Sequence, residues 1–146
     1  MKRFALSLLF AHLAILCTVS LMQAADVPHE RVIAMYFHRT ERCPTCQRMG
    51  GYSEEAVKTG FAGQIKARQV AFYDVDFQAP RNARLVNAYR ITGPTLIVAK
   101  VADNKVTSYR NLDDIWLKVR DKAAFFRYVQ ENVKTLLPQQ QTEDSP

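Results

Sequence analysis

Cys43-Pro44-Thr45-Cys46 follows an apolar run at residues 32–37 and opens a segment, residues 43–61, in which apolar side chains recur at helical spacing. The sequence therefore predicts a strand, then two cysteines separated by two residues, then a helix. At a helix N-terminus, the free N–H groups and the helix dipole stabilise a thiolate on the first cysteine. Because the thiolate is the attacking species in thiol–disulfide exchange, this stretch is typical of a redox-active cysteine pair.

The composition is that of an ordinary globular protein of one domain. Its 146 residues are 48% hydrophobic and 23% charged, with a formal net charge of +6. The positive charges form no dense run of lysine and arginine, which disfavours nucleic acid as a partner.

The N-terminus has the pattern of a signal peptide. Lys2 and Arg3 precede an apolar stretch at residues 4–22, and Ala24 and Ala25 supply small residues for cleavage. We expect cleavage after one of these alanines, leaving a net charge of about +4 on a chain exported to the periplasm or another extracytoplasmic space. The alternative is an uncleaved membrane anchor, because the apolar stretch is close to the minimum length for spanning a bilayer.

Export would leave two cysteines, Cys43 and Cys46, because Cys17 lies inside the predicted signal. A disulfide between them closes a very short loop, so its stabilisation of the fold through the unfolded state is small. Redox chemistry explains such a pair better than structural stapling does. We therefore expect the Cys43–Cys46 disulfide to be the redox group, with no separate cofactor and no bound metal.

The rest of the chain alternates strand and helix patterns, and we expect an α/β fold with a mixed four-stranded sheet and helices on both faces. Crossover connections would supply parallel pairs, a turn at Asn104 an antiparallel edge, and Gly50-Gly51 a kink or break in the first helix. The expected divisions are a signal peptide (1–25), a lead-in (26–30), the domain (31–137) and a disordered tail (138–146).

The segment Tyr89-Arg90-Ile91-Thr92-Gly93-Pro94-Thr95-Leu96 carries a resemblance. Together with the order of strands and helices around the cysteine pair, it resembles the thioredoxin fold, in which a cis-proline precedes the third core strand and lies beside the cysteines. The resemblance covers roughly residues 32–137. It implies a cis bond before Pro94, and it implies that Thr92, Gly93 and Pro94 position the substrate.

A narrower similarity is to the ArsF family of exported thioredoxin-like proteins, described as a subunit of a nitroreductase of nitrophenyl compounds. It is carried by residues 36–46, 110–116 and 121–125, and we transfer no reaction from it. The chain departs from thioredoxins, which have a buried aspartate where this strand has Phe37 or His38. They also have tryptophan in place of Arg42.

We assign Cys43 as the nucleophile and Cys46 as the resolving cysteine. Arg39, Arg42 and Arg48 would lower the pKa of Cys43, because cations stabilise a thiolate. His38 is either a proton shuttle or a group that polarises Cys43, or it is a histidine that caps the end of the strand. The candidate modulators of the pair are His38, Arg39, Arg42 and Thr45.

The sequence favours an exported thiol–disulfide oxidoreductase that acts on protein or small-molecule disulfides or dithiols, with a redox partner protein that the sequence does not identify. The alternative is a soft-metal or metalloid binder, in which both thiolates and His38 hold copper(I) or arsenic, or an accessory subunit of a redox complex. A third reading is an interaction module without redox activity. The direction of electron flow stays open.

Overall fold

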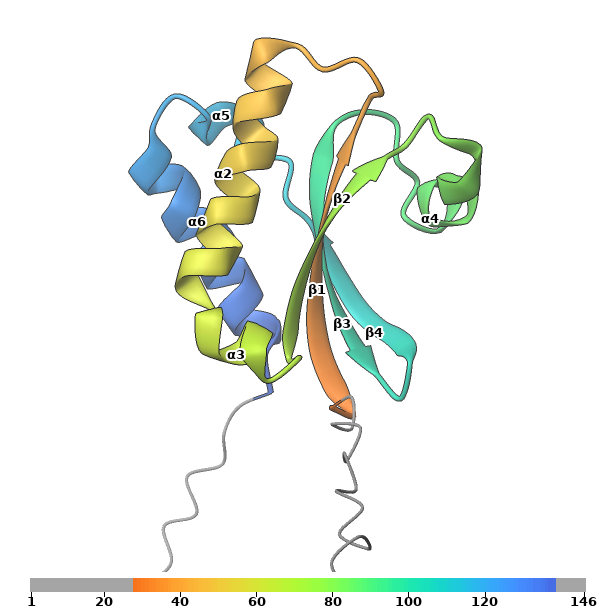
Figure 1. Ribbon diagram of the computed structural model, residues 1–146, viewed down its shortest axis with the longest axis vertical. Helices are drawn as coiled ribbons and strands as arrows, with labels where there is room; N and C mark the ends of the chain where they lie inside the picture. Colours follow the sequence, from red (N-terminus) through yellow and green to blue (C-terminus); the bar gives the residue numbers. More distant parts are fainter. Residues whose placement is uncertain (1–27, 139–146) are drawn as a thin grey trace, which may run out of the picture.

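The computed structural model describes residues 28–138. Its centre is one sheet of four strands in the order β2-β1-β3-β4 (Figure 1). The strands are β1 (Glu30–His38), β2 (Val70–Asp76), β3 (Thr95–Ala102) and β4 (Lys105–Asn111). The predicted α/β fold with a mixed four-stranded sheet is confirmed.

One expectation about the sheet is wrong. Of the two crossover connections, only the first joins parallel strands: β1 pairs with β2 in parallel and with β3 in antiparallel orientation. At the end of β2, Asp76 lies opposite His38, and at the start of β3, Thr95 lies opposite Phe37. The chain between β2 and β3 therefore stays at one end of the sheet, and β3 runs back along β1.

Helices cover both faces of the sheet, as expected. One face carries α2 (Pro44–Gly60), α3 (Ala62–Lys66), α5 (Ile115–Lys118) and α6 (Lys122–Leu136) (Figure 1). The other face carries the short helical segment η2 (Pro80–Asn82) and α4 (Ala83–Ala88). Successive side chains of β1 point to opposite faces, so Tyr36 is buried under α2 and α6, while Phe37 is buried on the side of α4.

The helix after the cysteines runs without interruption through Gly50-Gly51, so of the expected kink or break the break does not occur. Gly50 is buried where α2 crosses the ring of Tyr36, and a Cβ on Gly50 would lie 2.9 Å from Tyr36 Cε1. Nothing lies within 4 Å of the corresponding position at Gly51. The first glycine therefore permits close packing of helix on sheet, and that packing outweighs the low helix propensity of the pair.

The predicted hairpin turn is confirmed, and the last helix begins with a side-chain cap. Asp103 and Asn104 have φ values of 50° and 60° in the turn between β3 and β4, as a tight hairpin turn requires. The Asp121 side chain accepts a hydrogen bond of 3.0 Å from the backbone N–H of Ala124 at the start of α6.

The predicted signal peptide and nearly all of the predicted tail lie outside the described residues. Within residues 28–138, no helix is long and apolar enough to cross a membrane.

Candidate functional site

The two cysteines meet at the first turn of α2. Cys43 is the N-cap residue, with extended backbone, and Pro44 follows at the first helical position, where a missing N–H costs nothing. Cys43 Sγ accepts a hydrogen bond from the backbone N–H of Cys46 over 3.3 Å, and the two sulfur atoms lie 2.8 Å apart. Both cysteines are free, with Cys43 exposed and Cys46 buried. The predicted placement of the pair at a helix start is therefore what the structure has.

The acidities of the two thiols are pushed in opposite directions. The Cys46 thiol donates to Cys43 Sγ and, together with the Cys46 backbone N–H, holds the pKa of Cys43 below its ordinary value. Burial, followed by the hydrogen bond and the charge of Cys43, raises the pKa of Cys46. Of the two thiols, the exposed one therefore ionises first and the buried one second.

Two of the three arginines near the cysteine pair contact groups other than the sulfur atoms. The groups that lower the pKa of Cys43 are Cys46 and the backbone N–H groups of the first turn. Arg42 Nη2 instead donates to Asp74 Oδ2 over 2.5 Å, and the Arg39 guanidinium lies 5.8 Å from the ring centre of Phe77. Arg48 is exposed on α2. Thr45, the remaining candidate modulator, lies between the cysteines and contributes one of those N–H groups.

His38 is buried at the end of β1, and its ring is engaged on both sides. Nδ1 lies 2.7 Å from the backbone carbonyl of Arg39, so it carries the proton. Nε2 then accepts from Arg42 Nη2 over 2.6 Å and lies 3.3 Å from Asp74 Oδ1. Neither ring nitrogen is left to exchange a proton with Cys43, so this geometry favours the strand-end reading over the proton shuttle.

Two residues of the site were not singled out from the sequence. The buried Tyr36 hydroxyl donates to the backbone carbonyl of Cys46 over 2.8 Å, and burial raises its pKa, so it remains a neutral donor. The Tyr36 side chain lies beneath the cysteine pair, on the face of the sheet that α2 and α6 cover. Asp74 on β2 binds Arg42, the residue that precedes the nucleophile. Both bonds join residues that are far apart in the sequence, so neither was visible there.

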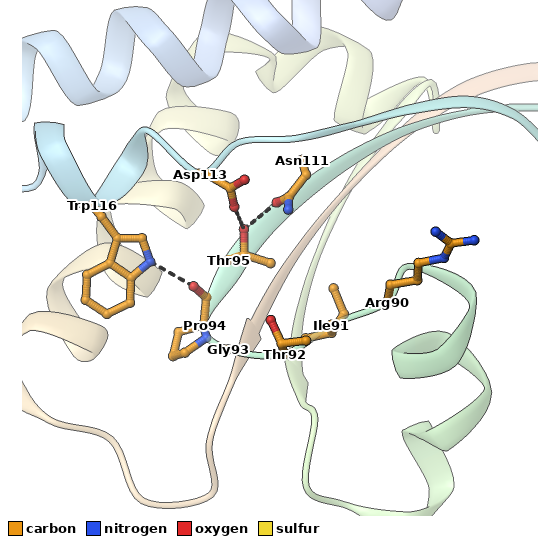
Figure 2. A pocket seen from close by; sticks show the side chains of 9 residues that line it. All are labelled: Arg90, Ile91, Thr92, Gly93, Pro94, Thr95, Asn111, Asp113 and Trp116. Atoms are coloured by element: carbon orange, nitrogen blue, oxygen red, sulfur yellow. Dashed lines mark hydrogen bonds between the residues drawn. The ribbon is translucent and has the colours of Figure 1, made fainter.

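The predicted substrate-positioning residues Thr92, Gly93 and Pro94 precede β3 at the same end of the sheet as the cysteine loop, because Thr95 pairs with Phe37. They line a cavity of about 230 Å³ (Figure 2). The cavity is also lined by Arg90, Ile91, Thr95, Asn111, Asp113 and Trp116.

Trp116 holds the segment of Thr92, Gly93 and Pro94 in place. Its Nε1–H donates to the carbonyl of Pro94 over 2.9 Å (Figure 2). The expected cis bond is not present, and the Gly93–Pro94 peptide is trans. The trans isomer is favoured for X–Pro bonds by about 0.5–1 kcal/mol. With this isomer the chain after Pro94 still brings Thr95 opposite Phe37 of β1.

A metal site of three ligands is not formed in the described part of the chain. No three His, Cys, Asp or Glu side chains converge there. His38, the third ligand of the copper(I) or arsenic alternative, has its ring bound to Arg39 and Arg42.

No protein-family model matches the sequence, and a search of curated proteins found no match, so the similarity to the ArsF family gains no support. Solved structures do match. Oxidised thioredoxin from Plasmodium falciparum aligns at 16% identity and a TM-score of 0.43, covering 70% of this chain and 82% of its own. Thioredoxin from Malassezia sympodialis aligns at 18% identity and 0.42, covering 70% and 79%.

A mutant thioredoxin from Halobacterium salinarum aligns at 24% identity and a TM-score of 0.38, covering 73% of this chain and 78% of its own. At these scores, the fold assignment rests on the sheet itself. Its order β2-β1-β3-β4, with a helix over one face after β1 and a helix over the other face before β3, is a thioredoxin-like arrangement.

Proposed function

We propose that this thioredoxin-like protein is a thiol–disulfide oxidoreductase that uses Cys43 and Cys46. One observation carries the proposal: an exposed sulfur at the N-cap of α2 accepts hydrogen bonds from the thiol and the backbone N–H of the cysteine one turn later. This arrangement stabilises a thiolate where a substrate can reach it, and it keeps the second sulfur in position to attack the first in a mixed disulfide and release the substrate.

The reaction proceeds in two exchanges. The Cys43 thiolate attacks one sulfur of a substrate disulfide, forms a mixed disulfide and releases the other substrate sulfur as a thiolate. That thiolate takes up the Cys46 proton, directly or through water. The Cys46 thiolate then attacks Cys43 Sγ, which forms the Cys43–Cys46 disulfide and releases the second substrate sulfur. The substrate gains two electrons and the cysteine pair loses two.

The same steps run in reverse oxidise a dithiol, so the partner is a protein or small molecule that carries a disulfide or a dithiol. Thr92, Gly93 and Pro94 are proposed to position it, because they line the cavity at the cysteine end of the sheet. Export to the periplasm or another extracytoplasmic space remains part of the proposal, supported by the N-terminal pattern of Lys2, Arg3 and the apolar stretch after them. Sequencing the N-terminus of the protein recovered from the periplasmic fraction tests it.

The direct test of the activity is whether the protein catalyses the reduction of insulin, with dithiothreitol as the electron donor. The proteins compared are wild type, Cys43→Ser, Cys46→Ser and the control Gly51→Ala. We expect turnover with wild type and Gly51→Ala and none with Cys43→Ser. Cys46→Ser should form a mixed disulfide with insulin that only dithiothreitol, and not the protein itself, resolves. Turnover by Cys43→Ser would contradict the proposal. Stoichiometric uptake of copper(I) or arsenite by wild type without turnover would favour the metal-binding alternative instead.

A further inference from the structure

We propose that Asp74 is a positioning residue that holds the Arg42 guanidinium at the edge of β2, away from the sulfur of Cys43. This inference rests on the proposed redox function, because it concerns the nucleophile of that reaction. Arg42 is then not a cation that stabilises the Cys43 thiolate, because its charge is paired with the carboxylate of Asp74.

Three side chains form a closed cluster at this edge. Arg42 Nη2 lies 2.5 Å from Asp74 Oδ2 and 2.6 Å from His38 Nε2, and His38 Nε2 lies 3.3 Å from Asp74 Oδ1. The His38 side chain is 8% exposed, that of Arg42 26% and that of Asp74 44%. The carboxylate and the imidazole thus give Arg42 two acceptors in a partly desolvated place, where charge-assisted hydrogen bonds are strong.

The path of Arg42 explains how it reaches β2 from the cysteine loop. Its Nη1 lies 3.4 Å from the position that a Cβ on Gly50 would occupy, beside the ring of Tyr36. Burial raises the pKa of Tyr36 most, and the nearby charges of Arg42 and Asp74 respectively lower and raise it. Arg42 therefore runs along α2, over the helix-facing side of the sheet, and ends at the carboxylate of the edge strand.

The other charged groups around the loop have different partners. Asp76 accepts from the Thr40 hydroxyl over 2.7 Å and from the backbone N–H of Gln78. Arg39 lies over Phe77. Among the described residues, Asp74 is the carboxylate that forms an ion pair with Arg42. If Asp74 loses its charge, Arg42 keeps only a neutral acceptor, and its cation becomes available to the adjacent Cys43 thiolate.

A double-mutant cycle tests this inference. Asp74→Asn, Arg42→Gln and the double variant are compared with wild type, and the pKa of Cys43 is measured from the ultraviolet absorbance of the thiolate. We expect Asp74→Asn to lower that pKa by about half a unit, a modest shift because both groups are partly solvated and screened. The thiolate fraction below the pKa then rises about threefold.

Above the pKa, where the reduced form carries the thiolate, the same shift stabilises the reduced form about threefold and raises the reduction potential of the pair by about 14 mV, since a tenfold change corresponds to about 30 mV for two electrons. Asp74→Glu should restore the wild-type pKa. Asp76→Asn, which removes a neighbouring carboxylate bound to Thr40, should leave it unchanged. In the Arg42→Gln background, Asp74→Asn should have no effect on the pKa of Cys43.

An unchanged or raised pKa in Asp74→Asn, or the same shift with and without Arg42, overturns the inference. This readout does not need turnover. If the wild-type protein does not reduce insulin, the proposed function fails. If the effects of the Arg42 and Asp74 substitutions on the pKa of Cys43 are independent, only this inference fails.

Discussion

The backbone N–H of Cys46 points at the sulfur of Cys43 over 3.3 Å, so the resolving cysteine helps to stabilise the charge of the nucleophile whose sulfur it later attacks. The contact exists because Cys43 is the N-cap of α2 and Cys46 lies one turn into the helix. Once Cys43 has reacted, its sulfur no longer carries the charge that raises the pKa of Cys46. The buried thiol then ionises more readily, at the stage when it must attack.

The two adjacent glycines of α2 should respond in opposite ways to alanine. Gly50→Ala places a Cβ 2.9 Å from the fully buried Tyr36 ring, so we expect a loss of about 1–2 kcal/mol in the free energy of unfolding, because overpacking outweighs the gain in helix propensity. Gly51→Ala meets no atom within 4 Å and should gain about 0.5–1 kcal/mol. Urea denaturation of the reduced proteins measures both. Equal stabilisation by the two substitutions would contradict the packing of α2 against Tyr36.

Tyr36→Phe removes a buried hydroxyl and leaves the carbonyl of Cys46 without that donor. We expect a loss of about 1 kcal/mol in the free energy of unfolding, the usual net value of such a hydrogen bond. Tyr73→Phe is the matched control, because Tyr73 is 54% exposed on the edge strand and should change stability little. If both variants unfold at the wild-type urea concentration, the hydroxyl of Tyr36 does not support the cysteine turn.

Trp116→Phe keeps an aromatic ring beside the cavity but loses the hydrogen bond to the carbonyl of Pro94. We expect kcat/KM for insulin to fall about fivefold, which corresponds to about 1 kcal/mol of positioning, while the alkylation rate of Cys43 stays at the wild-type value. Steady-state kinetics and alkylation are measured on the same preparation. A parallel fall in both rates would show that Trp116 acts on the cysteine pair and not on the loop before β3.

Much of the fold was readable because local patterns determined it. An apolar run between Gly93-Pro94 and the turn at Asn104 marks the strand at residues 95–102, and β3 has these bounds. The direction of that strand was not readable. Periodicity gives the faces of a strand but not its neighbour or its orientation, and the antiparallel pairing with β1 depends on where the connection from β2 ends.

The site divides in the same way. The position of Cys43 at a helix start follows from the order of strand, cysteines and helix, and the structure has it. The sequence suggested that Arg42 interacts with its neighbour Cys43. In the folded chain its partner is Asp74, which is 32 residues away on β2. Gly50 looked like a helix breaker for the same reason, because its contact with Tyr36 exists only after the helix has packed on the sheet.

The most direct test of the account is the pH dependence of alkylation at each cysteine of the reduced, folded protein, mapped by mass spectrometry. A lowered pKa means that the thiolate is present from a lower pH upward, so Cys43 should be labelled at a pH below that of an ordinary thiol. Cys46, whose pKa is raised, should stay unlabelled until a higher pH. Labelling of both cysteines over one ordinary thiol titration, or of Cys46 first, would contradict the account.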